Sequence, residues 1–252
     1  IKSIDTSKAL AMPGVLAVMT GADLPEPGNR TIGAGEGAMA LRDLCPMIMA
    51  RDKVLFHAQP VAAVAATSPE LAAAAAQTID VVYEPLPVVT DCRRALAADA
   101  PILHHDRFPD GEPKEPTNLA ARIVAQVGEP DVAFEQAHTI VERTYTVPMC
   151  HQGYIEPHAC VARVDADDRV DLWCCTQGPF SVRSYTAAVT GIDEGLIRVT
   201  PSEIGGGFGG KTTVYLEPVA VLLARQAGRP VKMVMDRGDV FRATGPAPGA
   251  ET

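Results

Sequence analysis

The run Ile204-Gly205-Gly206-Gly207-Phe208-Gly209-Gly210-Lys211 is the most informative stretch of this sequence. Five of the six residues from 205 to 210 are glycine. Glycine costs backbone entropy and contributes no side chain to a core, so the run is not the interior of a helix or a strand. Consecutive backbone amides in a turn form a concavity that binds anions, and Phe208 adds an apolar surface beside it. The run therefore predicts a loop whose bare backbone lies against a polyanionic cofactor.

Two nucleotide-binding motifs also fit this run, because glycine-rich strings match many patterns. Residues 205–212 fit the P-loop pattern G-x-x-x-x-G-K-[ST], and three of the glycines fit the dinucleotide pattern G-x-G-x-x-G. A P-loop follows a buried parallel strand, whereas Pro201 and Glu203 interrupt the apolar run in residues 196–204. A nucleotide site is therefore an alternative that the flanking sequence does not favour.

The composition restricts the classes of partner. The chain has 252 residues, a formal net charge of −9, 47% hydrophobic residues and 21% charged residues, which is ordinary for a soluble globular protein. The acidic balance argues against nucleic acid as a partner. The longest apolar stretch, residues 60–66, is too short to span a membrane. The six cysteines include no C-x-x-C pair, so we expect reduced, mostly buried thiols in a cytoplasmic protein.

The two ends of the sequence are unusual. It opens at Ile1, without methionine, in residues typical of the end of a strand. It closes on a loop rich in glycine and proline at 244–252. We expect a piece of a longer polypeptide or one part of a split one.

The expected elements form two α+β regions separated by a linker. Residues 1–105 contain a β-β-α-β unit whose helix is capped by Ser68 and begins at Pro69. Residues 106–125 are polar and proline-rich and predict a linker, and residues 126–252 form the second region. In the first region we expect helices at 6–10 and 69–79 and strands at 15–19, 54–56, 61–66 and 80–84. In the second we expect strands at 139–147, 159–165, 169–176, 197–200 and 230–235, and helices at 181–190 and 217–227.

Two further strings accompany the glycine run in the second region. They are Gln152-Gly153-Tyr154-Ile155-Glu156-Pro157-His158-Ala159 and Thr176-Gln177-Gly178-Pro179-Phe180-Ser181-Val182-Arg183. Gln177 stands at a strand-to-helix junction, where its side-chain amide is placed to donate a hydrogen bond to an oxygen ligand. In this order the three strings resemble the molybdenum-binding large subunit of the xanthine dehydrogenase and aldehyde oxidase family. Residues 59–64 and 82–87 resemble the α/β hammerhead domain of that family.

The resemblance implies a fold class and an activity. The fold class is α+β, with an α/β hammerhead domain followed by the first part of a molybdopterin-binding α+β domain. The activity is that of a molybdenum hydroxylase, an oxidoreductase that hydroxylates an aldehyde or an N-heterocyclic carbon with oxygen from water. The implied cofactor is molybdenum–molybdopterin in its cytosine dinucleotide form, which would pass electrons to iron–sulfur clusters, with or without FAD, on partner subunits or domains. The expected partners are the remainder of the large subunit, an iron–sulfur subunit, a FAD subunit in some assemblies and a small-molecule substrate.

The resemblance also assigns residues to the cofactor. By position, Gln177 matches a glutamine that hydrogen-bonds an oxygen ligand of molybdenum, and Phe208 and Gly209 match a loop that packs against the metal's ligands. The cofactor-binding residues implied are Gln177, Gly207, Phe208, Gly209 and Gly210, with Gln177 and Phe208 nearest to the metal. A neutral amide donor stabilises an oxo group without protonating it. From the residues alone, Gln177 could equally cap the following helix or donate to a buried carbonyl.

The departures from the family pattern limit what the resemblance implies. Thr212 stands where purine-oxidising members have a glutamate, which argues against xanthine as the substrate. The family's catalytic glutamate lies beyond residue 252, so we assign no catalytic residue and expect no activity from this chain alone. Glu156 and His158 resemble an acid–base pair, but we expect them to be structural, and we expect Lys211 at the surface. The alternative to an enzyme portion is a non-catalytic fragment or assembly module.

Overall fold

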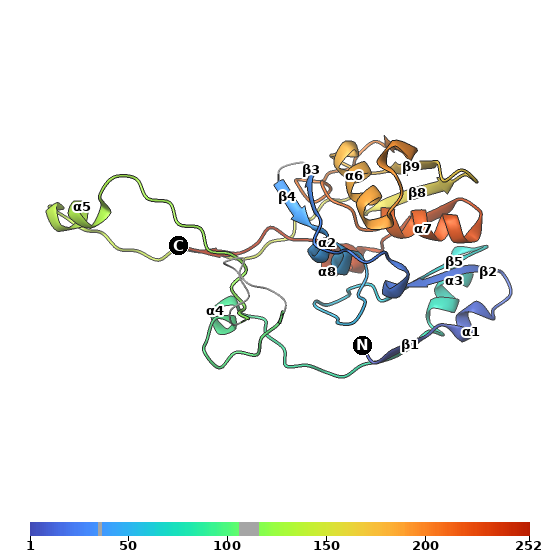
Figure 1. The fold of residues 1–252 in the computed structure, drawn as a ribbon, viewed down its shortest axis with the longest axis horizontal. Coiled ribbons are helices and arrows are strands. Elements are labelled where there is room, and N and C mark those ends of the chain that lie inside the picture. The colour runs from blue at the N-terminus through green and yellow to red at the C-terminus, as the bar shows by residue number, and fades with distance from the viewer. Residues whose placement is uncertain (35–36, 106–115) are drawn as a thin grey trace. The chain divides into compact units, whose positions relative to one another are not determined.

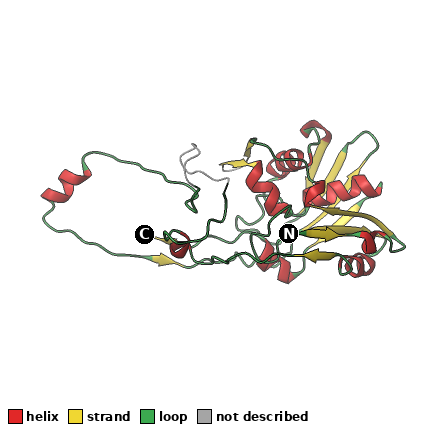
Figure 2. Ribbon diagram, turned by 60° about the horizontal axis from the view of Figure 1, so that its bottom comes forward, coloured by secondary structure: helices red, strands yellow, loops and turns green. Residues whose placement is uncertain are grey.

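The computed structural model describes residues 1–34, 37–105 and 116–252, and the chain divides into two compact units. Unit 1 comprises Ile1–Tyr83 and Thr146–Glu251, and unit 2 comprises Glu84–Tyr145 with Thr252. The helices and strands are concentrated in unit 1, while loops make up most of unit 2 (Figure 2). Residues 106–115 of the predicted linker lie outside the described residues, and residues 116–125 contain no helix or strand.

A four-stranded sheet in the order β10-β9-β8-β11 is the main sheet of unit 1. Its strands are β8 (Ala159–Val164), β9 (Val170–Cys174), β10 (Ile197–Pro201) and β11 (Val231–Val234). β8 pairs antiparallel with β9 and β11, whereas β9 and β10 are parallel. Parallel neighbours need a long crossover connection, and α6 (Pro179–Thr190) with the 3-10 helix η2 (Glu194–Leu196) supplies it.

The pairing register places several chain segments at one edge of this sheet. Cys174 at the end of β9 is paired with Pro201 at the end of β10 and lies next to Cys160, near the start of β8. Val234 at the end of β11 is paired with Ala159. We call this edge the glycine-loop edge, because residues 205–211 follow β10 there. We call the opposite edge, at Val164, Val170 and Ile197, the arginine edge.

The first part of unit 1 consists of short paired strands and small helices. They are β1 (Ser3–Asp5), α1 (Ser7–Leu10), β2 (Val15–Thr20), the 3-10 helix η1 (Gly21–Asp23), β3 (Thr31–Ala34), β4 (Gly37–Ala40), α2 (Leu41–Ile48), β5 (Ala62–Ala66), α3 (Pro69–Ala76) and β6 (Asp80–Val82). β2 pairs antiparallel with β5, β1 with β6, and β3 with β4. α3 begins as predicted, because the Ser68 hydroxyl accepts a hydrogen bond from the backbone N–H of Leu71 at 3.2 Å.

The helix α7 (Glu217–Ala227) joins the two parts of unit 1 into one core (Figure 1). It packs against β8 and β11 of the main sheet, and also against β2 and β5. Its residues from Glu217 to Ala224 are all buried, and it ends as predicted at Gly228, whose φ is 61°. The core extends from Met19 and Leu44 to Leu172, Val182 and Leu223.

The remaining elements are short. Unit 1 also contains β7 (Thr146–Val147), which pairs with β12 (Ala250–Glu251), and α8 (Arg237–Ala243). Unit 2 contains α4 (Cys92–Ala95) and α5 (Pro130–Gln136). Among the described residues, no helix has the length and apolar character that crossing a membrane would require. Four of the six cysteines are buried, and Cys92 and Cys150 are exposed, which agrees with the expectation of mostly buried thiols.

Two of the predicted strands are wrong. Residues 54–56 are irregular, and of the segment predicted as a strand at 139–147 only Thr146–Val147 forms a strand, with Tyr145 before it hydrogen-bonded to Thr252. Both segments are rich in residues that favour strands, but a strand needs a partner to satisfy its backbone groups. The side chains from Thr139 to Tyr145 are exposed, so no core face holds them in a sheet.

Candidate functional site

The glycine loop, residues 205–211, meets two other segments at the glycine-loop edge. Gln177 follows β9 and precedes α6, which is the strand-to-helix junction that the sequence predicts. The segment 152–158 leads into β8. Ligands in sheets of this type bind beyond the carboxyl ends of parallel strands, and β9 and β10 both end at this edge. The three strings that the sequence analysis singled out therefore converge on one place.

Side chains of this chain lie directly against the glycine loop and explain three of its glycines. A Cβ atom at Gly205 would lie 2.6 Å from Cβ of Glu156, and one at Gly207 would lie 2.7 Å from Cδ of Gln177. A Cβ atom at Gly210 would lie 2.8 Å from Cε1 of Tyr154. No side chain fits at these positions because the neighbouring side chains already occupy the space.

The backbone amides of the loop are divided between the protein and open space. The N–H of Gly205 donates to Glu156 Oε2 at 2.8 Å, and the N–H of Gly210 donates to the Gly207 carbonyl at 2.7 Å. The N–H groups of Gly209 and Lys211 donate to Gln177 Oε1 at 3.0 and 3.2 Å. Within the described part of the chain, the N–H groups of residues 206–208 have no acceptor. Of the amide concavity that the sequence predicts, the N–H groups of these three residues thus remain available to a ligand.

The Gln177 side chain is held in one orientation by the loop. Its Oε1 accepts the two loop N–H groups, and its backbone N–H donates to the Lys211 carbonyl at 2.9 Å. No described residue accepts from its Nε2, and the side chain is exposed. The helix-capping alternative does not apply, because α6 has Gly178 at its N-cap and no side-chain cap. The free end of the amide is therefore a hydrogen-bond donor that faces out of the edge.

Phe208 stands at the exposed tip of the glycine loop. Its φ is +48°, a left-handed conformation that is uncommon for a residue other than glycine. Its neighbours Gly206 and Gly209 also have positive φ, at 94° and 86°. The ring is 73% exposed, and a Cβ atom at Gly209 would meet nothing within 4 Å. The loop therefore presents an aromatic ring and an open stretch of backbone beside the Gln177 donor.

Lys211 is buried, and the expectation of a surface lysine is wrong. Its side chain is completely covered, and its Nζ donates to Glu156 Oε2 at 2.7 Å. Nζ also lies 4.9 Å from the centre of the Tyr154 ring. Burial raises the pKa of Glu156, but the hydrogen bonds from Lys211 and Gly205 outweigh it, and the pKa is lowered overall. A P-loop lysine must reach a phosphate, so this arrangement does not fit the nucleotide-binding alternative.

His158 lies in a hydrogen-bonded cluster beneath the loop, as the structural interpretation predicts. It is 2% exposed, and its Nε2 lies 2.6 Å from the Tyr154 hydroxyl. That hydroxyl also lies 3.2 Å from Thr244 Oγ1. Burial, together with the positive charge of Lys211, lowers the pKa of His158 to about 4. A neutral, covered imidazole stabilises the packing here and does not reach a ligand.

The sequence analysis missed the role of Tyr154. This residue is 1% exposed and contacts Gly206, Gly210 and Lys211 of the glycine loop. Its backbone carbonyl accepts a hydrogen bond from Arg237 Nη1 at 2.8 Å. The spacing of Tyr154 and His158 within the quoted string was the available signal, but a contact with a loop more than fifty residues later leaves no local pattern.

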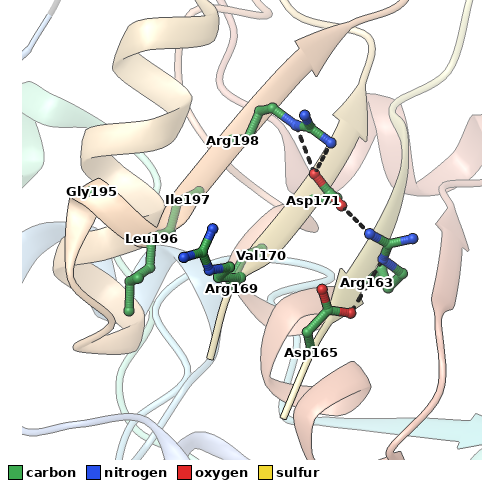
Figure 3. A pocket seen from close by; sticks show the side chains of 9 residues that line it. All are labelled: Arg163, Asp165, Arg169, Val170, Asp171, Gly195, Leu196, Ile197 and Arg198. Carbon is green, nitrogen blue, oxygen red and sulfur yellow. Dashed lines mark hydrogen bonds and ion pairs between the residues drawn. The ribbon is translucent and has the colours of Figure 1, made fainter. Parts of the chain in front are cut away.

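The arginine edge carries a second cluster of charged side chains, which surround a pocket of 390 Å³ (Figure 3). Asp171 lies between Arg163 and Arg198, and each contact measures 2.5 Å. Arg169 is paired with Asp167 at 2.8 Å. Every arginine in the pocket is therefore paired with a carboxylate, and the pocket offers no unpaired charge for a ligand.

The residues at the glycine-loop edge fit an anionic organic cofactor better than a directly bound metal. The described residues contain no group of three His, Cys, Asp or Glu side chains that could hold a metal ion. The loop offers three N–H donors, the Gln177 amide nitrogen and an exposed aromatic ring instead. Donors of this kind bind a polyanionic ligand through its oxygen atoms.

Two protein-family models match this chain. Residues 1–87 match the aldehyde oxidase and xanthine dehydrogenase a/b hammerhead domain, and residues 112–252 match the molybdopterin cofactor-binding domain. The carbon monoxide dehydrogenase large chain of Afipia carboxidovorans is 35% identical in an alignment 251 positions long, which covers 97% of this chain and 30% of the relative. A probable hypoxanthine oxidase XdhD of Escherichia coli K12 is 32% identical over 96% of this chain and 28% of its own length.

Solved structures also resemble this chain over nearly its whole length. The reconstituted CO dehydrogenase from Oligotropha carboxidovorans superimposes with a TM-score of 0.79 and 35% identity, over 98% of this chain and 31% of that one. The aldehyde oxidoreductase from Desulfovibrio gigas gives a TM-score of 0.79 and 25% identity, over 99% of this chain and 27% of that one. The chain thus spans about a third or less of these similar proteins.

Proposed function

Because the chain belongs to the molybdopterin cofactor-binding family of aldehyde oxidases and xanthine dehydrogenases, we propose that it forms part of the cofactor site of a molybdenum hydroxylase. The α+β fold class, with a hammerhead domain before a molybdopterin-binding domain, is confirmed. The reaction we propose is hydroxylation of an aldehyde or an N-heterocyclic carbon, with oxygen from water and electrons leaving to iron–sulfur partners. We also propose the domain division into 1–105, 106–125 and 126–252. The gap between the two family matches, residues 88–111, supports a break in this region, although the second match begins inside the proposed linker.

The orientation of Gln177 is the observation that carries this proposal. Two loop amides occupy its Oε1, so its Nε2 is left as a neutral donor at the carboxyl ends of β9 and β10. When bound, the molybdenum–molybdopterin cofactor supplies the redox chemistry of the reaction. Gln177 would bind it through the amide N–H, and a neutral donor stabilises negative charge on oxygen without giving up a proton.

The glycine loop would supply the remaining contacts of this chain to the cofactor. Phe208 and the open backbone at Gly209 would lie against it, with Gly207 beneath them. The N–H groups of residues 206–208 would donate to its oxygen atoms. Gly210 packs against Tyr154, so its contribution would be to let the loop lie close to the protein.

Neither Glu156 nor His158 is placed to act as a general base at this edge. Glu156 is paired with Lys211, and its pKa is lowered, so it is a poor proton acceptor near neutral pH. His158 is covered and bonded to Tyr154. As the family resemblance implies, we propose that the base comes from residues outside these 252.

Thr212 bears on the substrate. It is exposed, and its hydroxyl donates to the Gly209 carbonyl at 3.0 Å. A neutral hydroxyl that is already bonded to the loop does not replace the carboxylate of purine-oxidising relatives. We propose a substrate other than xanthine.

The further parts of the proposal rest on the family. They are the cytosine dinucleotide form of the cofactor, an iron–sulfur subunit, FAD on a further subunit in some assemblies, the remainder of the large subunit and a cytoplasmic location. The multi-subunit character of relatives such as the carbon monoxide dehydrogenase large chain supports the partners.

Elemental and pterin analysis tests the proposal. The protein is purified together with its partners, and its molybdenum and its released pterin nucleotide are measured by mass spectrometry. We expect near-stoichiometric molybdenum with a cytosine dinucleotide. A pure, folded complex that contains neither would favour the assembly-module alternative, and guanine in place of cytosine would correct only the cofactor form.

A further inference from the structure

We infer that Glu156 and Lys211 are positioning residues, whose ion pair closes the glycine loop and thereby fixes the outward orientation of the Gln177 amide. The consequence for the reaction rests on the proposed function, but the closure of the loop does not. The inference assigns a role to two charged residues that the proposed chemistry leaves unused.

One carboxylate oxygen binds both ends of the loop. Glu156 Oε2 accepts the N–H of Gly205 at 2.8 Å and the ammonium of Lys211 at 2.7 Å. The N–H of Glu156 also donates to the Gly205 carbonyl at 3.2 Å. The first and last residues of the seven-residue loop are thus joined through a single side chain from the segment 152–158.

The far end of the loop then holds Gln177. The N–H of Lys211 donates to Gln177 Oε1, and the carbonyl of Lys211 accepts from the backbone N–H of Gln177 at 2.9 Å. The hydroxyl of Thr176 donates to the same carbonyl at 3.1 Å. The backbone of Lys211, together with the N–H of Gly209, therefore determines which end of the Gln177 amide faces the protein. If Lys211 shifted, Oε1 would keep only the N–H of Gly209, and the amide would be held less firmly.

The surroundings of the Lys211 side chain leave Glu156 as its charged partner. Its side chain is completely covered, while that of Glu156 is 32% exposed. A covered ammonium needs a partner charge, and Tyr154 offers it only a ring face. No other carboxylate is paired with Lys211 in the described residues. Glu156 is therefore the counter-ion of Lys211, and loss of Glu156 leaves the covered ammonium without one.

Hydrogen exchange of the protein purified with its partners tests the inference. The variants are Lys211→Met, Glu156→Gln and the double variant, with Arg169→Met as the matched control. Arg169 forms an exposed ion pair with Asp167 at 2.8 Å, away from both the loop and α7. Exchange is followed in the peptide 203–213 and, as a measure of global stability, in α7.

We expect both single variants to raise exchange of the loop peptide by roughly tenfold, the factor that one charge-assisted hydrogen bond contributes. Each single variant leaves one charge without its partner, so exchange of α7 should rise as well. The double variant removes both charges, so exchange of α7 should return to the wild-type level while exchange of the loop peptide stays high. The control should change neither. Recovery of the loop together with α7 in the double variant would mean that the pair only neutralises a buried charge, and would overturn the inference.

A kinetic arm separates this inference from the proposed function. For each variant, kcat per bound molybdenum and KM are compared, and we expect kcat to fall by about tenfold with KM changed far less. An open loop with unchanged kcat would overturn the link to Gln177. Absence of molybdenum from the wild-type protein would count against the proposed function instead, because the exchange result does not depend on the metal.

Discussion

The two edges of the main sheet both carry ion pairs, but they bury them to different degrees. At the glycine-loop edge, Lys211 is completely covered and its pair with Glu156 binds backbone atoms as well. At the arginine edge, Asp171 is 12% exposed, but the side chains of Arg163 and Arg198 that hold it are 48% and 73% exposed (Figure 3). Exposed pairs contribute at most about 1 kcal/mol, whereas breaking a buried pair costs about 3–5 kcal/mol. The comparison indicates that the glycine-loop edge is the one at which an ion pair holds the backbone in place.

Replacement of Gln177 should give the largest effect. Gln177→Ala removes a preorganised donor, so we expect kcat to fall on the order of ten- to a thousand-fold at equal molybdenum content. The matched control is Gln226→Ala, at an exposed position of α7. Steady-state kinetics with metal analysis checks both variants. Unchanged kcat in Gln177→Ala would show that the glycine-loop edge contributes no more to the reaction than the arginine edge does.

Acid should destabilise the protein through His158. Its pKa is about 4 in the folded protein, lowered mainly by burial, against an ordinary value of 6.5. The unfolded chain binds the extra proton between these values, so the stabilisation is complete above pH 6.5 and is lost as the pH falls toward 4. We expect the loss to be at most about 1.4 kcal/mol per pH unit.

Denaturant unfolding at a series of pH values checks this dependence. His158→Gln should flatten the slope between pH 6.5 and 4, whereas the exposed His57→Gln should leave it unchanged. Equal slopes in wild type and His158→Gln would contradict the assignment of a neutral histidine beneath the loop.

A methyl group on the inner side of the glycine loop should destabilise the folded protein. In Gly210→Ala the new Cβ would lie 2.8 Å from Tyr154 and 3.1 Å from the Gly207 carbonyl, so we expect a loss of about 1–3 kcal/mol. The control is Gly33→Ala, where a Cβ meets nothing within 4 Å. Unfolding free energies of the two variants give the comparison. A Gly210→Ala variant as stable as the control would mean that the loop does not pack against Tyr154.

The arginine edge should give the smallest effect. Asp171 is itself only 12% exposed, but the two arginines that lose their charge partner in Asp171→Asn are 48% and 73% exposed, so water can solvate them. We expect a loss of less than about 1 kcal/mol that shrinks further in high salt, with kcat unchanged. Unfolding at low and high ionic strength measures it. A loss as large as that from breaking the buried pair would remove the contrast between the edges.

The sequence predicted those parts of the fold that have local signals. Ser68 and Pro69 mark the start of α3, and Gly228 marks the end of α7. Residues 139–145 also have a strand pattern, but a strand forms only where a partner pairs with it, and these residues remain exposed. Local propensity gives the type of an element, and tertiary pairing decides whether it forms.

The residues that converge at the glycine-loop edge could be singled out from the sequence, but their contacts with one another could not. The glycine run and Gln177 were visible because their residue types are unusual in those positions. The burial of Lys211 was not, because its partner Glu156 is 55 residues away in the sequence. The orientation of Gln177 likewise depends on amides 32 and 34 residues further along.

The position of the metal tests the central claim most directly. Anomalous X-ray scattering from crystals of the protein with its partners, measured on both sides of the molybdenum absorption edge, locates molybdenum without assumptions about the ligand. We predict one anomalous peak per chain, beyond the carboxyl ends of β9 and β10, facing Gln177 and Phe208. A peak at the arginine edge, or one remote from both of these residues, would contradict the account.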